Sequence, residues 1–201
     1  RAGIPVRLKV EDAADNTRTV ETEALTKQVN AWETLTFDFA NPASGTAALN
    51  LAYTYNKVSI FFDFGKTGAA GGAGTFLFDD VAFPTGRASG NTGTCTDACI
   101  DFASADVKYE PFEGLVSAEQ SDDPVDATNK VAKFVKGPTG QPWAGATVYT
   151  IEATKSVPEF DLSGSKIVTL RVYSPMVGMN VRLKLEDAAN NAIYLEKDVL
   201  T

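Results

Sequence analysis

Catalytic side chains are scarce in this sequence of 201 residues, which contains no histidine. Arrangements of the Ser-His-Asp or Cys-His type, in which a histidine base activates the nucleophile, are therefore excluded. A glycosidase needs two carboxylates about 5–10 Å apart, and no catalytic spacing of Asp or Glu stands out on any one predicted strand. The glycine-rich segment GKTGAAGGAG at 65–74 lacks the order of a phosphate-binding loop. The sequence predicts a protein that is not an enzyme.

Two tryptophans are candidates for contact with a ligand. Trp143 lies in the loop-like segment GPTGQPWAG, where a large apolar residue has no periodic reason to be buried. Loops on a rigid scaffold are frequent binding positions, so Trp143 either contacts a ligand or caps one end of the core. Trp32 begins the segment WETLTFDF. In an alternating strand its side chain points to the face opposite to that of Leu35 and Phe37. Trp32 is then either exposed on a sheet face or covers a sheet edge.

A polar platform is a third candidate for ligand contact. On two predicted strands, polar residues and one tyrosine alternate with valine and leucine; they are Arg171, Tyr173, Arg182, Lys184 and Glu186. If the two strands are neighbours, these side chains form one surface for sugar hydroxyls or for a uronic acid carboxylate. The alternative is that the charges are plain solvent contacts on a strand face.

The elements that position these residues are predicted to be strands. Alternation with a period of two residues dominates, and no segment keeps the 3.6-residue period of an amphipathic helix. Strands are predicted at 5–12, 17–23, 32–39, 57–64, 75–83, 100–112, 130–136, 146–152, 166–174 and 180–187. Short strands separated by Gly, Pro and Asn turns indicate an all-β sandwich or barrel.

One stretch of the chain occurs twice. GIPVRLKVEDAADNTRTVETEALT at 3–26 returns as GMNVRLKLEDAANNAIYLEKDVLT at 178–201, with 13 of 24 aligned positions identical and a constant offset of 175 residues. A fixed period is the signature of a repeat. Residues 1–83 then form the C-terminal part of one module, and 100–201 form the N-terminal part of the next copy. Alternatively, the halves close one sandwich as a circular permutant, and one duplicated hairpin is left loose or completes a neighbour's sheet.

Residues 84–99 are predicted to be a linker, because they are rich in Pro, Gly, Ser and Thr. Cys95 and Cys99 lie in it and form either a small local disulfide, which would indicate an oxidising compartment, or two free thiols. With two cysteines and no histidine, a four-ligand zinc site within the chain is excluded.

The net charge and the lengths of the apolar segments argue against some classes of binding partner. The net charge of −8 argues against nucleic acid and against anionic membrane surfaces. No apolar run approaches the roughly 20 residues of a membrane-spanning helix, so membrane insertion is not expected. Because the chain starts inside the repeat, we expect it to be a segment of a longer protein.

Four motifs together carry a family resemblance: FEG at 112–114, VRLKLEDAANN at 181–191, WETLTFDF at 32–39 and FDDVAF at 78–83. The sequence resembles the jelly-roll carbohydrate-binding modules that are appended, often in tandem, to secreted polysaccharide-degrading enzymes of marine and gut bacteria, such as laminarinases. In permuted order the resemblance covers one whole module. It implies a jelly-roll β-sandwich, a polysaccharide ligand and an extracellular or cell-surface location.

The resemblance also implies a structural calcium ion that ties the first strand to the last. The matching positions are Glu113 of FEG and Asp79 and Asp80 of FDDV, with Glu110 and Asn129 as further ligands. Calcium takes six to eight oxygen ligands. Adjacent acids on a regular strand point to opposite faces, so Asp79 is preferred to Asp80. The alternative is that these acids are a solvated strand end and a turn. A second candidate is the acidic loop at 117–129, with Asp122, Asp123 and Asp126.

The sequence thus predicts a non-catalytic polysaccharide-binding module of a secreted multimodular bacterial protein. The alternative is a structural tandem-repeat sandwich of an extracellular adhesin or filament, which would assemble by strand exchange with neighbouring repeats or copies of itself.

Overall fold

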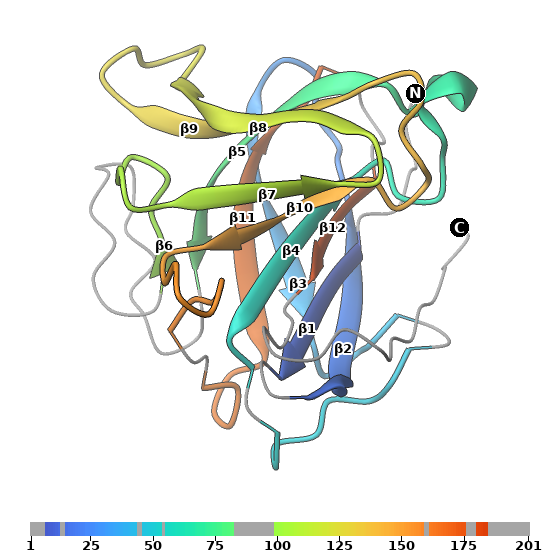
Figure 1. Ribbon diagram of the computed structural model, residues 1–201, viewed down its shortest axis with the longest axis vertical. Helices are drawn as coiled ribbons and strands as arrows, with labels where there is room; N and C mark the ends of the chain where they lie inside the picture. The colour runs from blue at the N-terminus through green and yellow to red at the C-terminus, as the bar shows by residue number, and fades with distance from the viewer. Residues whose placement is uncertain are drawn as a thin grey trace.

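The alternating segments form strands in the structure, a computed structural model that describes residues 7–12, 15–43, 46–53, 55–82, 99–158, 161–175 and 180–184. Over these residues, the regular structure is β-strand except for a single π-helical turn, η1 (Gly68–Gly72). Two sheets lie face to face with their apolar sides between them (Figure 1). The predicted all-β sandwich is confirmed.

Sheet A has the strand order β1-β2-β12-β4-β10-β7, with further pairings of β1 to β12 and to β4. Its strands are β1 (Arg7–Asp12), β2 (Asp15–Leu25), β12 (Asn180–Lys184), β4 (Lys57–Phe62), β10 (Gly145–Tyr149) and β7 (Lys108–Phe112). Only β1 and β12, among the described pairings, run parallel. β4 is buried over nearly its whole length, as its two apolar faces predict for a central strand.

Sheet B has the strand order β3-β11-β5-β9-β8, and a short sixth strand pairs with β5. Its strands are β3 (Trp32–Asp38), β11 (Ile167–Tyr173), β5 (Gly74–Ala82), β9 (Lys130–Lys136), β8 (Leu115–Asp122) and the short β6 (Cys99–Ile100). All described pairings in this sheet are antiparallel.

The predicted alternation holds on the strands that carry the candidate residues. In β11, Val168, Leu170 and Val172 are 0 % exposed, and the residues between them face solvent. In β3, Leu35 and Phe37 are buried in the same way. Because side chains alternate between the two faces of a strand, this burial assigns Trp32 and Tyr173 to the outer face of sheet B.

Both halves of the chain contribute strands to both sheets. In sheet A, β4 from the first half pairs with β10 from the second. In sheet B, β5 lies between β11 and β9, two strands of the second half. The predicted linker lies outside the described residues up to residue 98, and so does Cys95; the backbone of Cys99 belongs to β6.

Phenylalanine rings join the two sheets. Phe62 of sheet A stacks on Phe76 of sheet B, with ring centroids 4.8 Å apart and an interplanar angle of 5°. Phe78 packs edge-on against Phe102 and Phe134 at 4.9 and 4.7 Å. Offset-stacked and edge-to-face arrangements are the favourable geometries for aromatic pairs. These five buried rings form the centre of the core.

Truncation of Phe78 tests this assignment of the core. The side chain is 0 % exposed, and replacing a buried phenylalanine by alanine costs about 3–5 kcal/mol. We expect Phe78→Ala to lower the free energy of unfolding by that amount in urea denaturation followed by circular dichroism. Val116→Ala, at a side chain that is 65 % exposed, is the control and should change it by less than about 0.5 kcal/mol. Equal losses in the two variants would contradict the assignment.

Candidate functional site

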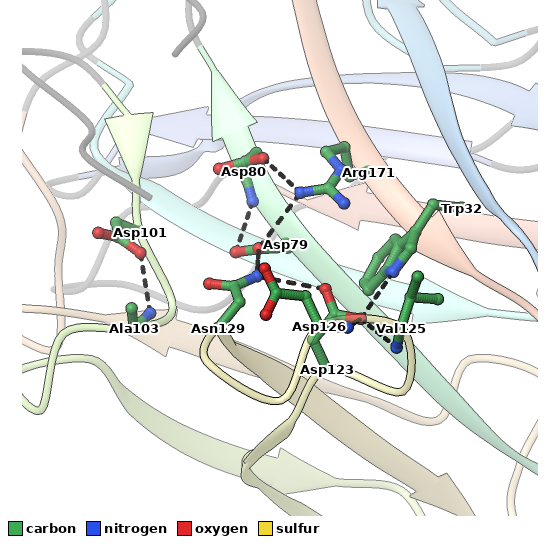
Figure 2. Close-up of polar contacts among 10 residues, drawn as sticks. All are labelled: Trp32, Asp79, Asp80, Asp101, Ala103, Asp123, Val125, Asp126, Asn129 and Arg171. Carbon is green, nitrogen blue, oxygen red and sulfur yellow. Dashed lines mark hydrogen bonds and ion pairs between the residues drawn. The ribbon is translucent and has the colours of Figure 1, made fainter. Parts of the chain in front are cut away.

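A β-bulge in β5 brings two adjacent aspartates to the same side of sheet B. Asp80 has a positive φ of 51°, and the register with β11 shifts by one residue between Thr169↔Ala82 and Arg171↔Asp79. An extra residue in one strand re-aims the side chains around it. Both carboxylates therefore approach Arg171 (Figure 2). The preference for Asp79 over Asp80 assumed a regular strand, and β5 is not regular at this point.

Arg171 lies between these carboxylates and an aromatic ring. Its Nη1 donates to Oδ2 of Asp80 at 3.0 Å and lies 3.6 Å from Oδ2 of Asp79. Its guanidinium carbon is 4.5 Å from the ring centroid of Trp32, a cation–π distance. Trp32 in turn meets Tyr173 edge-on, with centroids 5.6 Å apart. The guanidinium thus joins β3, β5 and β11.

Residues 117–122 of the predicted acidic loop belong to strand β8, so the prediction of a loop there is wrong. The acidic loop proper lies between β8 and β9, and it packs against the same side chains. Oδ1 of Asp123 accepts a hydrogen bond from the indole Nε1 of Trp32 at 2.9 Å and one from the backbone N–H of Val125 at 2.8 Å. The amide Nδ2 of Asn129 donates to Asp79 at 2.9 Å and to Asp123 at 3.3 Å (Figure 2). We call the set formed by Trp32, Asp79, Asp80, Asp123, Asn129, Arg171 and Tyr173 the Arg171 cluster.

The environment separates the acidities of two carboxyl groups in this cluster. Asp79 is 3 % exposed; burial raises its pKa to about 6, against the hydrogen bond from Asn129 and the charge of Arg171, which lower it. At Asp123, burial raises the pKa, but the hydrogen bonds from Val125, Trp32 and Asn129 together outweigh it and lower the pKa below its ordinary value. Asp79 therefore gains a proton in mildly acidic solution.

The solvent side of the cluster lies on the paired strands β3 and β11. Trp32 is directly opposite Tyr173, and Thr34 is directly opposite Arg171. Thr34 and Thr36 are exposed, and Trp32, Arg171 and Tyr173 are half-buried. We call Trp32, Thr34, Thr36, Arg171 and Tyr173 the outer-face platform.

Two residues of the predicted polar platform lie elsewhere. Arg171 and Tyr173 are on β11 in sheet B, whereas Arg182 and Lys184 are on β12 in sheet A. The condition that the two strands are neighbours is not met, because β11 and β12 belong to different sheets. Glu186 lies outside the described residues.

The predicted calcium ligands divide into two groups. Asp79, Asp80 and Asn129 meet in the Arg171 cluster. Glu113 lies in the turn before β8, and strand β8 separates it from Asp123; eight residues of strand correspond to roughly 26 Å. Glu110 on β7 pairs with Lys155 at 2.5 Å. The five residues do not form one site here, and Arg171 supplies the positive charge beside Asp79 and Asp80. Calcium binding stays a prediction.

Trp143 lies at the Glu113 end of the sandwich. Its side chain is 46 % exposed in the loop before β10. Backbone hydrogen bonds hold this loop: the N–H of Gly65 donates to Pro142 at 3.1 Å, and the N–H of Gln141 donates to Glu113 at 2.9 Å. The loop therefore presents Trp143 to solvent, far from Trp32.

A buried lysine close to that end has a structural explanation. Lys136 is 1 % exposed, and its ammonium donates to the backbone carbonyls of Phe62, Asp63 and Lys66 at 3.3, 3.4 and 2.9 Å. Burial lowers its pKa to about 8, although the charge of Asp63 raises it. The lysine satisfies carbonyl groups at the strand ends, so no ligand is needed to explain it.

Part of the site could have been found from the sequence, and part could not. Side chains alternate between the two faces of β3, so Trp32, Thr34 and Thr36 share the outer face. The alternation alone therefore predicts Thr34 and Thr36 as neighbours of Trp32. The bond from Trp32 to Asp123 joins residues 91 positions apart, and no local pattern encodes it. Asp123 was singled out only as a member of an acidic loop.

Comparisons with protein-family models, with curated proteins and with solved structures found no match for the chain. The resemblance to carbohydrate-binding modules therefore rests on the quoted motifs alone. Among the described residues, no helix has the length and apolarity to cross a membrane.

Asp79→Asn tests the electrostatics of the cluster. A native pKa of about 6, above the ordinary 3.8, means that protonated Asp79 contributes stability that is fully present below pH 4 and is lost as the pH rises through 6. We expect the wild type to lose about 2–3 kcal/mol relative to Asp79→Asn between pH 4 and pH 7, measured by urea denaturation at each pH.

Asp123→Asn is the matched control of opposite sign. Because the pKa of Asp123 is lowered, the stability that its carboxylate contributes is lost only as the pH falls below about 4. Parallel stability curves for wild type and Asp79→Asn between pH 4 and pH 7 would contradict the buried position of Asp79.

Proposed function

We propose that this chain is a non-catalytic polysaccharide-binding module of a secreted protein, and that the outer-face platform is its ligand surface. The observation that carries the proposal is the direct pairing of Trp32 with Tyr173, next to the paired Arg171 and Thr34. An aromatic pair, a guanidinium and hydroxyl groups thus lie together on one solvent-facing side.

The chemistry of the platform matches that of a sugar. Pyranose rings present CH groups that pack on aromatic side chains, and they present hydroxyls that need hydrogen-bonding partners. Ligand sites combine apolar surface with a few placed polar groups in the same way. Both ion pairs of Arg171, with Asp79 and with Asp80, are made through Nη1, although a guanidinium carries five N–H donors. The solvent-facing side of two paired strands is also open along the strands, as an extended polymer requires.

The charges near the platform favour a neutral polysaccharide. Asp79 and Asp80 lie within 3.6 Å of the Arg171 guanidinium, and Asp123 holds the indole of Trp32. The cluster thus contains three acids and one cation, and the chain carries a net charge of −8. An anionic polysaccharide would therefore be repelled.

Two other locations support ligand binding less well. A pocket of about 530 Å³ is lined by Ile100, Asp101, Ser104, Asp106, Val107, Lys108, Thr150 and Glu152. None of these lining residues is aromatic, so the pocket offers no ring for stacking. Trp143 is an exposed ring at the other end of the sandwich, but its contacts include no second aromatic ring among the described residues.

Affinity electrophoresis in gels containing laminarin, xylan, agarose or alginate tests the proposal. We expect at least one neutral polysaccharide to retard the wild type at pH 7, and alginate to cause no retardation. Tyr173→Ala should weaken the binding about tenfold or more, equivalent to roughly 1.4 kcal/mol, because it removes half of the aromatic pair.

Trp143→Ala is the matched control, since it removes an exposed aromatic ring far from the platform. Circular dichroism should show that both variants keep the wild-type fold. The proposal fails if no gel retards the wild type, or if Tyr173→Ala is retarded as strongly as the wild type. Loss of binding in Trp143→Ala alone would move the ligand surface to the opposite end.

A further inference from the structure

The duplicated stretch supplies two strands of sheet A, β1 and β12, and both pair with β2 in the same register. Arg7 of the first copy and Arg182 of the second are equivalent positions, 175 residues apart. Both are paired with the same residue of β2, Glu23. The two copies therefore recognise the same partner strand in the same way.

The two copies also pair with β4 in the same register. Residues 181–184 of β12 pair with Phe62 to Ser59 of β4, and Val10 and Glu11 of β1 pair with Val58 and Lys57. Val10 is the equivalent of residue 185, the next position of the second copy. Lys184 pairs with Ser59, and Val10 pairs with the next residue of β4, Val58. The two copies therefore pair with consecutive residues of β4.

One strand position between β2 and β4 is thus shared by two half-inserted copies. β12 fills one end and β1 fills the other, and Figure 1 shows them following one another between β4 and β2. Among the described residues, they pair with each other at Lys9 and Lys184, which are equivalent positions and form a parallel bridge. Because the copies share Arg, Leu, Lys, Glu and Asp at matching positions, either one offers the position the same backbone partners and nearly the same side chains.

We propose that this position is an acceptor for one whole copy of the duplicated strand, and that the copy left over is a donor for the same position in a second molecule of this chain. Sheet A has one acceptor position and each chain has two donors. Exchange of an identical element between protomers replaces each pairing by an equal one, so its main cost is association. The inference goes beyond polysaccharide binding and does not depend on it.

Proline substitutions in the full chain test the redundancy. Proline removes a ladder hydrogen bond from a strand that is flanked on both sides. Leu8→Pro and Leu183→Pro should each leave the melting temperature within about 3 °C of the wild type, because the other copy fills the position. The double variant should lose roughly 10 °C or more. Ala146→Pro in β10, a strand without a duplicate, is the matched control and should lose as much alone. Additive losses in the two single variants would overturn the proposal.

Complementation in solution tests the exchange between chains. The double variant Leu8→Pro/Leu183→Pro has an acceptor position and no intact donor, and the wild type has a donor to spare. Refolded together, they should form a one-to-one complex in size-exclusion chromatography with light scattering, whereas the double variant alone should form none. If the single variants are as unstable as the double variant, or no mixed complex forms when the double variant keeps its strand spectrum, the acceptor position is not shared.

Discussion

The ion pair of Arg171 with Asp79 and Asp80 sets the geometry of the candidate binding face. A guanidinium that is partly buried needs its charge compensated and its donors satisfied, and the bulge at Asp80 provides a second carboxylate where a regular strand would provide one. The guanidinium then fixes the plane of the Trp32 ring. Since Trp32 donates to Asp123, the acidic loop is held to the sheet through the same chain of contacts.

Strand β5 connects this polar face to the core. Its residues Phe76 and Phe78 point inward and pack against rings of both sheets, while Asp79 begins the bulge on the outer side. A displacement of β5 would therefore move the core rings and the carboxylates together. Because β5 also lies between β11 and β9, the strand that bears Arg171 and the strand that follows the acidic loop both take their positions from it. The outer-face platform and the core therefore share one supporting strand.

The sequence was sufficient for what depends on one strand at a time. Period-two alternation predicted most of the strands and their inner faces, and it gave Trp32 and Tyr173 the face opposite to the buried residues of β3 and β11. It could not assign strands to sheets, because either sheet satisfies the same apolar face; Arg182 was accordingly grouped with Arg171 although its strand lies in sheet A. It could not find the bulge, because an aspartate at positive φ depends on tertiary partners rather than on local preference.

The shared strand position gives the repeat a geometric meaning. Strand β1 occupies part of the position between β2 and β4. The chain then contributes strands to both sheets, and 175 residues later β12 occupies the same position. One period is therefore one closed circuit around the sandwich. In such a circuit the order of the two halves along the chain is immaterial to the pairing, because every strand finds the same neighbours from either starting point. A chain that continues for a further period meets an occupied position, and it must displace the earlier copy or complete another sandwich.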